Sequence, residues 1–235
     1  MKYFIIVMTF LLPQYSYAEM ISNIHLTSDY IYRGISNSAR NPAVQGGLDY
    51  YNDFGIYTGV WASTVDYELV SDEPSYEFDV YGGMTGELAS IGWDVGFLYF
   101  TYPNASSSYQ LDAHEFHIGL SRDVNDVSIT TAYHYSPEYS GAGNSHYIEA
   151  NIDILLPDEF NLSLHAGHQS FENNYWYDLP DYTDWKIVIG REISGILVEL
   201  SWTDTNIKDN NACFSGTDWC GSQFTLDVHR DFNFF

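Results

Sequence analysis

From residue 21 onward, apolar and polar residues alternate in short segments that turn-forming residues separate. In residues 91–99 and 196–202, every second residue is apolar. A period of two is typical of β-strands with one polar and one apolar face, and no segment shows a comparable helical period of 3.6. With weaker matches at 43–52, 55–64 and 112–121, the pattern predicts an all-β fold of about twelve strands, within a range of ten to fourteen.

The connections between these segments alternate in length. Short ones fall at 52–55, 88–91, 123–126, 157–159 and 193–195, and longer ones at 33–42, 66–75, 102–111, 136–146, 171–183 and 204–222. A transmembrane barrel has short periplasmic turns and longer extracellular loops, and its tilted strands need about 9–11 residues to cross a bilayer. The sequence therefore predicts a transmembrane antiparallel up-and-down β-barrel, with both termini on the periplasmic side.

In each predicted strand, the alternate positions that hold the apolar residues form one face, which we call the apolar parity. This face carries almost no ionisable group. The exceptions are Arg191, Arg230 and His168, which we expect near strand ends, where long side chains reach the membrane interface. The apolar stripes also finish in aromatic residues, as in the interfacial girdles of membrane barrels: Tyr30, Tyr50, Tyr99, Tyr135, Trp185 and Trp202. A soluble sandwich would alternate too, but it has no reason to build such girdles.

The opposite parity carries charged residues, which we expect to line the lumen. They are Asp29, Asp49, Glu77, Asp79, Asp94, Glu115, Glu149, Asp153, Glu199 and Asp227, with Arg33 and Lys186 as the cations. Rings of carboxylates attract cations and repel anions. Because a barrel of about eight strands is filled and one of 16–18 holds a wide channel, about twelve strands permit a narrow pore. Alternatively, the carboxylates pair with tyrosines and the few cations and plug the barrel.

Arg33 stands in SDYIYRGISNSARNPAVQGG, residues 28–47, a strand–loop–strand hairpin in this interpretation. Asp29 and Arg33 share the inward parity of the first strand. Arg33 either neutralises carboxylates in a polar interior or acts as a selectivity element in an acidic pore. The strand at 55–64 has apolar residues on both parities, so its register stays open.

The N-terminal residues MKYFIIVMTFLLPQYSYA, 1–18, have the features of a cleaved secretory signal peptide. Lys2 precedes an apolar run that is too short to span a membrane, and small residues precede Glu19. We therefore expect residues 19–235 to form one barrel domain in the outer membrane of a Gram-negative bacterium. The formal net charge of −24 argues against a nucleic-acid partner, and 17% aromatic residues argue against disorder.

Two features near the C-terminus fit this location. Cys213 and Cys220 are predicted to form a local disulfide, as expected in an exported protein. The segment FTLDVHRDF, 224–232, resembles the terminal strand of bacterial outer-membrane proteins, which the barrel-assembly machinery reads at a final phenylalanine. Here either Phe232 or Phe235 could serve.

The segments SDYIYRGIS, NPAVQGGLDY and GIYTGVWAS resemble the N-terminal signature of the TorF family of proposed porins. Family size, the late cysteine pair and the terminal strand are also similar. The resemblance implies an outer-membrane β-barrel and a channel of undefined solute.

We therefore expect a channel for passive diffusion of small hydrophilic solutes, cationic or neutral, without a cofactor and without enzymatic activity. One alternative is an outer-membrane hydrolase, but the histidines of HEFH and HAGH are three apart and face opposite sides of a strand, and no GxSxG motif is present. Another is a plugged barrel acting through its loops, in which acidic segments 66–73 and 171–184 could hold divalent cations that bridge to lipopolysaccharide. The oligomeric state is not indicated.

Overall fold

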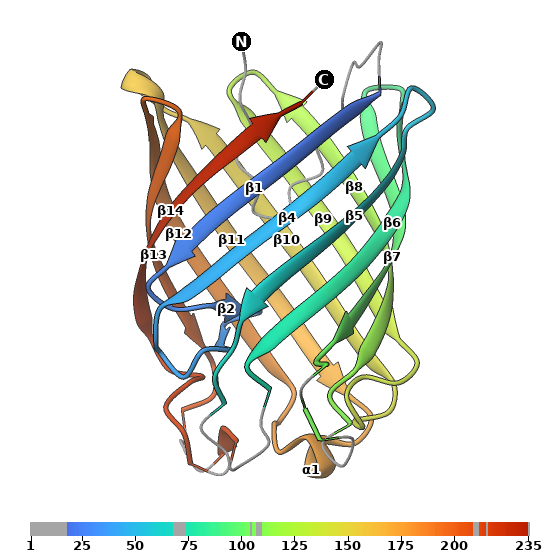
Figure 1. The fold of residues 1–235 in the computed structure, drawn as a ribbon, viewed down its shortest axis with the longest axis vertical. Helices are drawn as coiled ribbons and strands as arrows, with labels where there is room; N and C mark the ends of the chain where they lie inside the picture. The colour runs from blue at the N-terminus through green and yellow to red at the C-terminus, as the bar shows by residue number, and fades with distance from the viewer. Residues whose placement is uncertain are drawn as a thin grey trace.

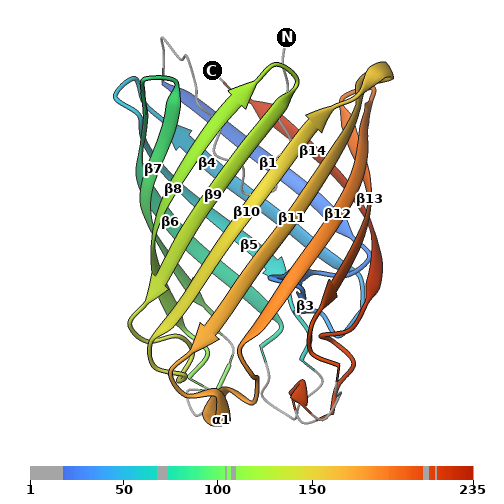
Figure 2. The same ribbon diagram turned by 180° about the vertical axis from the view of Figure 1, so that it is seen from behind.

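The computed structural model describes residues 18–67, 74–103, 105–106, 110–208, 212–214 and 216–234. Within these ranges, twelve strands close into an antiparallel barrel (Figures 1 and 2). Neighbours in the sheet follow chain order, and β1 (Glu19–Thr27) closes the barrel by pairing with β4 (Ala43–Tyr51) and β14 (Gln223–Asn233). The predicted twelve-strand up-and-down barrel is confirmed. Residues 1–17 of the predicted signal peptide lie outside the described residues, so its cleavage stays a prediction.

The other elements follow in chain order. The barrel strands are β5 (Ile56–Thr64), β6 (Tyr76–Leu88), β7 (Ile91–Thr101), β8 (Ala113–Val124), β9 (Val127–Ser136), β10 (Ser145–Leu155), β11 (Phe160–Phe171), β12 (Tyr182–Ile193) and β13 (Ile196–Thr205). A separate hairpin consists of β2 (Ile31–Tyr32) and β3 (Ile35–Ser36), and the short helices are η2 (Pro157–Glu159) and α1 (Asn174–Tyr177). In the described part of the chain, no helix is long and apolar enough to cross a membrane.

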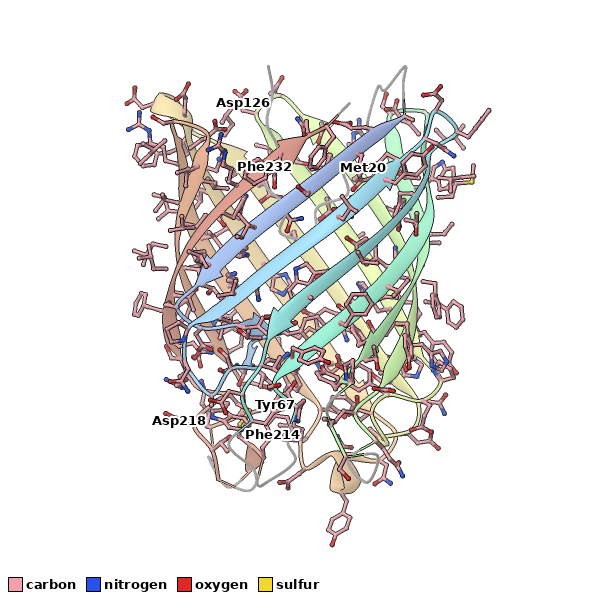
Figure 3. The ribbon with its side chains drawn as sticks, viewed as in Figure 1. Met20, Tyr67, Asp126, Phe214, Asp218 and Phe232 are labelled. Carbon is pink, nitrogen blue, oxygen red and sulfur yellow. A yellow bond between two sulfur atoms is a disulfide. The ribbon has the colours of Figure 1, made fainter. Side chains whose placement is uncertain are left out.

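The two ends of the barrel differ as predicted. The short turns lie at the end that holds both termini, with Met20, Asp126 and Phe232, and the longer loops lie at the other, with Tyr67 and Phe214 (Figures 1 and 3). We call these the turn end and the loop end. Two of the turns consist of two residues each, 89–90 and 194–195, and all four residues have positive φ. Two-residue turns with positive φ match the twist of the paired strands.

The barrel is apolar outside and polar inside. Leu26, Ile118 and Leu200 are each about half exposed on the outer face, whereas Glu115 is 1% exposed on the inner face of β8. This arrangement suits a strand with lipid on one side and a polar lumen on the other. The open register of β5 is settled: Trp61 packs against the inward Tyr30, so Ala62 and Val60 face outward.

The structure corrects the first strand. It ends at Thr27, so Asp29 and Arg33 lie in the following loop and not on a strand. The Thr27 hydroxyl donates to the backbone carbonyl of Asp29 at 2.7 Å and accepts from its N–H. Such local side-chain bonds compete with the strand ladder and end it early. Tyr30 is consequently buried and is not part of an outer girdle.

Candidate functional site in the barrel interior

The loop of residues 28–42, which we call the inward loop, carries the β2–β3 hairpin into the lumen near the loop end (Figure 1). Its turn residues Arg33 and Gly34 have φ of 46° and 81°. A Cβ at Gly34 would lie 2.6 Å from Cβ of Asp184 and 2.8 Å from Cγ2 of Thr205. Only glycine combines that conformation with so close an approach, so the hairpin tip packs directly on the wall formed by β12 and β13.

Arg33 reaches across the lumen to β8. Its Nη1 and Nη2 each donate to one carboxylate oxygen of Glu115 at 2.8 Å, and Nη1 also donates to Oε1 of Gln169 at 3.0 Å. The guanidinium lies 4.1 Å from the ring centroid of Tyr147. The Arg33 and Glu115 side chains are 6% and 2% exposed. A bidentate arginine–carboxylate pair is strongly oriented, so it fixes the hairpin in one place.

Asp29 holds the base of the inward loop. One of its carboxylate oxygens accepts from the hydroxyls of Ser36 at 2.5 Å and Ser38 at 2.9 Å. Burial raises the pKa of this carboxyl, and the two serine hydrogen bonds partly oppose the shift. The serines thus bind the two ends of the hairpin to each other through Asp29.

Inward histidines and carboxylates form a belt across six neighbouring strands, β7 to β12. His117 contacts Asp94 at 2.5 Å, the rings of His117 and His134 are 5.6 Å apart, and His134 contacts Glu149 at 3.2 Å. His165 then lies 3.7 Å from Glu149 and 2.8 Å from Asp184. We call Asp94, His117, His134, Glu149, His165 and Asp184 the histidine–carboxylate belt.

A second group of ionisable residues lies on β12, β13, β14 and β1. His25 contacts Asp227 at 3.1 Å, and its ring is 5.4 Å from that of His229. Lys186 interacts electrostatically with Glu199 and Asp227. This inward lysine therefore lies within electrostatic range of two carboxylates.

The predicted lumen residues occupy the inner face in two ways. Two of them, Asp29 and Arg33, lie on the inward loop. The others alternate with outward residues on their strands and face inward: Asp49, Glu77, Asp79, Asp94, Glu115, Glu149, Asp153, Lys186, Glu199 and Asp227. Their role in lining a water-filled pore stays a prediction. Asp184, Tyr147 and Gln169 are not among the lumen residues predicted from the sequence. Their inward parity was the available signal, and only the cross-strand register brings them to Arg33 and His165.

Aromatic residues and a disulfide loop pack against the hairpin at the loop end. The predicted disulfide between Cys213 and Cys220 is present. It holds a loop in which Trp219 is 4% exposed, and the Trp219 carbonyl accepts from the N–H of Ser36 at 3.1 Å. The Arg40 side chain also binds the Asp218 carbonyl. The disulfide loop and the inward loop thus support each other.

The inward histidines lie beside carboxylates or beside one another. The described residues contain no group of three or more histidine, cysteine or acidic side chains that could hold a metal ion. His25, His117, His134 and His165 each face a carboxylate, and His229 faces His25. Carboxylates in these positions orient the histidine rings.

Comparisons with known proteins agree with the fold. A family described as "Bacterial protein of unknown function (Gcw_chp)" matches residues 14–232. No match was found among curated proteins. Among solved structures, the chain is similar to the KdgM porin in complex with disordered oligogalacturonate, with a TM-score of 0.59 and 7% identity over 91% of this chain and 99% of that chain.

Two further solved structures are similar over most of their length. For the NanC porin the TM-score is 0.57, with 13% identity over 90% of this chain and 97% of that chain. For the COG4313 outer membrane channel from Pseudomonas putida F1 it is 0.54, with 6% identity over 95% and 97%. At such identities the likeness shows a shared fold.

Proposed function

We propose that this chain, which belongs to the Gcw_chp family of bacterial proteins of unknown function, is a narrow outer-membrane channel for passive diffusion of small hydrophilic solutes, with a preference for cations. The observation that carries the proposal is the charge of the inner face. Inward carboxylates are found on strands around the barrel, among them Glu77 on β6 and Asp227 on β14. Of the two predicted inward cations, Arg33 is bound by Glu115, and Lys186 interacts electrostatically with Glu199 and Asp227. Such a lumen attracts cations and repels anions.

The inward loop determines the size of solute. Because Arg33 spans from the hairpin to Glu115, it divides the lumen at the level of the histidine–carboxylate belt. A solute that passes must fit beside this contact, which favours small molecules and ions over oligomers. The similarity to structures titled as porins and a channel, and the resemblance of segments within residues 28–63 to TorF porins, support this assignment.

The location follows from the same features. An outward apolar face, a predicted signal peptide at residues 1–18 and a terminal β14 carrying Phe232 suit export to the outer membrane, with insertion by the barrel-assembly machinery. Phe235, the other candidate signal, lies outside the described residues. Outer-membrane lipid and lipopolysaccharide are then the surrounding partners. The acidic segment 66–73 lies mostly outside the described residues, so bridging by divalent cations there stays a prediction.

A plugged barrel is the second candidate, and one observation favours it. The inward loop and the disulfide loop together bury Ile35, Phe100 and Trp219 in one apolar cluster at the loop end. If that packing is permanent, the protein acts through its outer loops. A hydrolase is less well supported, because the similar solved structures are titled as porins and a channel.

Conductance separates these candidates. The mature chain, refolded and inserted in planar bilayers, is expected to show discrete conductance steps. Across a KCl gradient, the reversal potential should have the sign of K⁺ permeation. The double variant Glu199→Gln with Asp153→Asn removes two inward charges while keeping side-chain size, and should move the K⁺ to Cl⁻ permeability ratio toward one.

A matched control removes an acidic residue outside the lumen. Glu172→Gln changes an exposed loop carboxylate and should leave the permeability ratio unchanged. A folded barrel without conductance would exclude the open channel and favour the plugged barrel. Anion preference in the wild-type chain would refute the acidic-lumen interpretation.

A further inference from the structure

A cavity lies at the loop end, beside the inward loop. Its volume is about 120 Å³, and aromatic residues form most of its wall, among them Tyr67, Phe100, Tyr102, Tyr139, Phe214 and Trp219. Tyr67 and Phe214, at the loop end in Figure 3, come from different loops. The aromatic wall is thus assembled from segments far apart in the chain.

The rings form a connected wall. The ring centroid of Tyr67 lies 6.2 Å from that of Tyr102 and 6.3 Å from that of Trp219, and Phe214 lies 5.9 Å from Trp219. Because the faces of aromatic rings carry negative electrostatic potential, such a wall attracts an organic cation.

One carboxylate, Glu77, also lines the cavity. It is 2% exposed, and its two oxygens accept from the hydroxyls of Tyr30 at 3.2 Å and Tyr102 at 2.9 Å. These bonds orient the carboxylate. Glu77 therefore supplies a fixed negative group beside the aromatic wall.

Asp79 and Glu77 are joined by a side-chain hydrogen bond, so one proton is shared between the two carboxyls and the pair carries one negative charge. Asp79 lies two residues from Glu77 on the same face of β6, is 7% exposed, and its Oδ1 has no hydrogen-bond partner among the described residues. It interacts electrostatically with both Glu77 and Glu115, and the guanidinium of Arg33 is already bound by Glu115. A cation in the cavity would lower the electrostatic free energy of the negative charge that Glu77 and Asp79 share.

We propose that this cavity binds small organic ammonium ions, with the charged head against the aromatic rings and beside Glu77. A cavity of ~150 Å³ holds benzene, so one of about 120 Å³ has room for a trimethylammonium head. Anions are disfavoured by the carboxylates. An inorganic metal ion is disfavoured because the described residues offer no group of three ligating side chains.

This inference extends the proposed function by naming a solute class, but binding itself does not require conduction. The refolded mature chain in detergent micelles is titrated with choline chloride by calorimetry at constant ionic strength. Its uncharged carbon isostere, 3,3-dimethyl-1-butanol, is the matched ligand control. Choline is expected to bind saturably at one site, at least about tenfold more tightly than the isostere.

Two variants test the site. Glu77→Gln should weaken choline binding about tenfold, and Tyr102→Phe should weaken it less by releasing one bond to Glu77. Glu159→Gln, which removes an exposed carboxylate of η2 at the turn end, should leave affinity unchanged. Circular dichroism verifies that each variant folds, and Tyr102→Phe carries the test if Glu77→Gln does not fold.

Equal affinity for choline and its isostere, unchanged binding in a folded Glu77→Gln or Tyr102→Phe, or no saturable binding would overturn the inference. The channel is tested separately. Conductance without choline binding refutes the ammonium site and leaves the channel, whereas binding without conductance refutes the channel and leaves the site.

Discussion

At the scale of single residues, the Arg33–Glu115 pair joins the inward loop to β8. Both side chains are almost fully buried, and each satisfies the other through two hydrogen bonds of 2.8 Å. Arg33 also has a positive φ of 46°, which is unfavourable for a residue with a side chain. The contact with Glu115 therefore has to compensate for both the backbone conformation and the loss of hydration.

We expect Arg33→Met to lower the free energy of unfolding by about 3 kcal/mol, because it leaves the Glu115 charge buried without its partner. The double variant Arg33→Met with Glu115→Gln should recover most of that loss. Urea titrations of the barrel in lipid vesicles, arranged as a double-mutant cycle, measure the coupling. Additive effects of the two substitutions would show that the contact between Arg33 and Glu115 does not hold the inward loop in place.

At the scale of elements, the inward loop is held by its approach to the wall. Gly34→Ala should destabilise the hairpin by about 2 kcal/mol, from the positive φ and from the contacts of the new Cβ with Asp184 and Thr205. Gly195→Ala is the matched control, because its φ of 79° is similar and nothing lies within 4 Å of the added Cβ.

The two alanine variants are compared by urea unfolding and by single-channel conductance. A larger conductance in Gly34→Ala alone is expected if the loop narrows the pore. Equal stability loss in the two variants would mean that the hairpin tip is not packed against β12 and β13.

The disulfide loop is a second element with a measurable role. Replacing Cys213 and Cys220 by serine should lower the free energy of unfolding by about 2 kcal/mol, since the bridge closes a short loop. Because Trp219 accepts from Ser36, the loss should also increase proteolytic cleavage within the inward loop. Proteolysis of the variant and of the reduced wild-type chain tests this. Unchanged cleavage in both would show that the disulfide loop does not support the inward loop.

The strands could be predicted from the sequence, and the inward loop could not. Alternation identifies a strand such as β7 because lipid and lumen impose opposite polarity on successive side chains. The same alternation continues through Tyr30 and Tyr32, which misplaces Arg33 on the first strand. The belt depends on cross-strand register, which the parity of His165 alone does not specify.

At the scale of the whole molecule, charge is sorted both radially and along the barrel axis. Most strand carboxylates are directed inward, and Asp204 near the loop end of β13 is an outward exception. Arg122 is an outward residue that the sequence pattern did not single out, and with Arg191 and Arg230 it lies within the last few residues of its strand at the turn end. A long cationic side chain there reaches the membrane interface, whereas the middle of a strand faces hydrocarbon. The position of an outward charge, more than its presence, should therefore decide whether the barrel inserts.

Two leucines test this on the same outer face. Leu200 is 50% exposed in the middle of β13. Leu200→Arg should lower the free energy of unfolding by about 2–4 kcal/mol, because the guanidinium would enter the hydrocarbon region. Leu88, 75% exposed at the end of β6, should cost about 0–1 kcal/mol in the same exchange. Urea titrations of folding into lipid vesicles measure both. Similar losses of stability in Leu200→Arg and Leu88→Arg would contradict a bilayer centred on the strands. The expected difference would place the hydrocarbon region between the two ends of the barrel. The inward loop would then lie in the half of that region nearer the loop end.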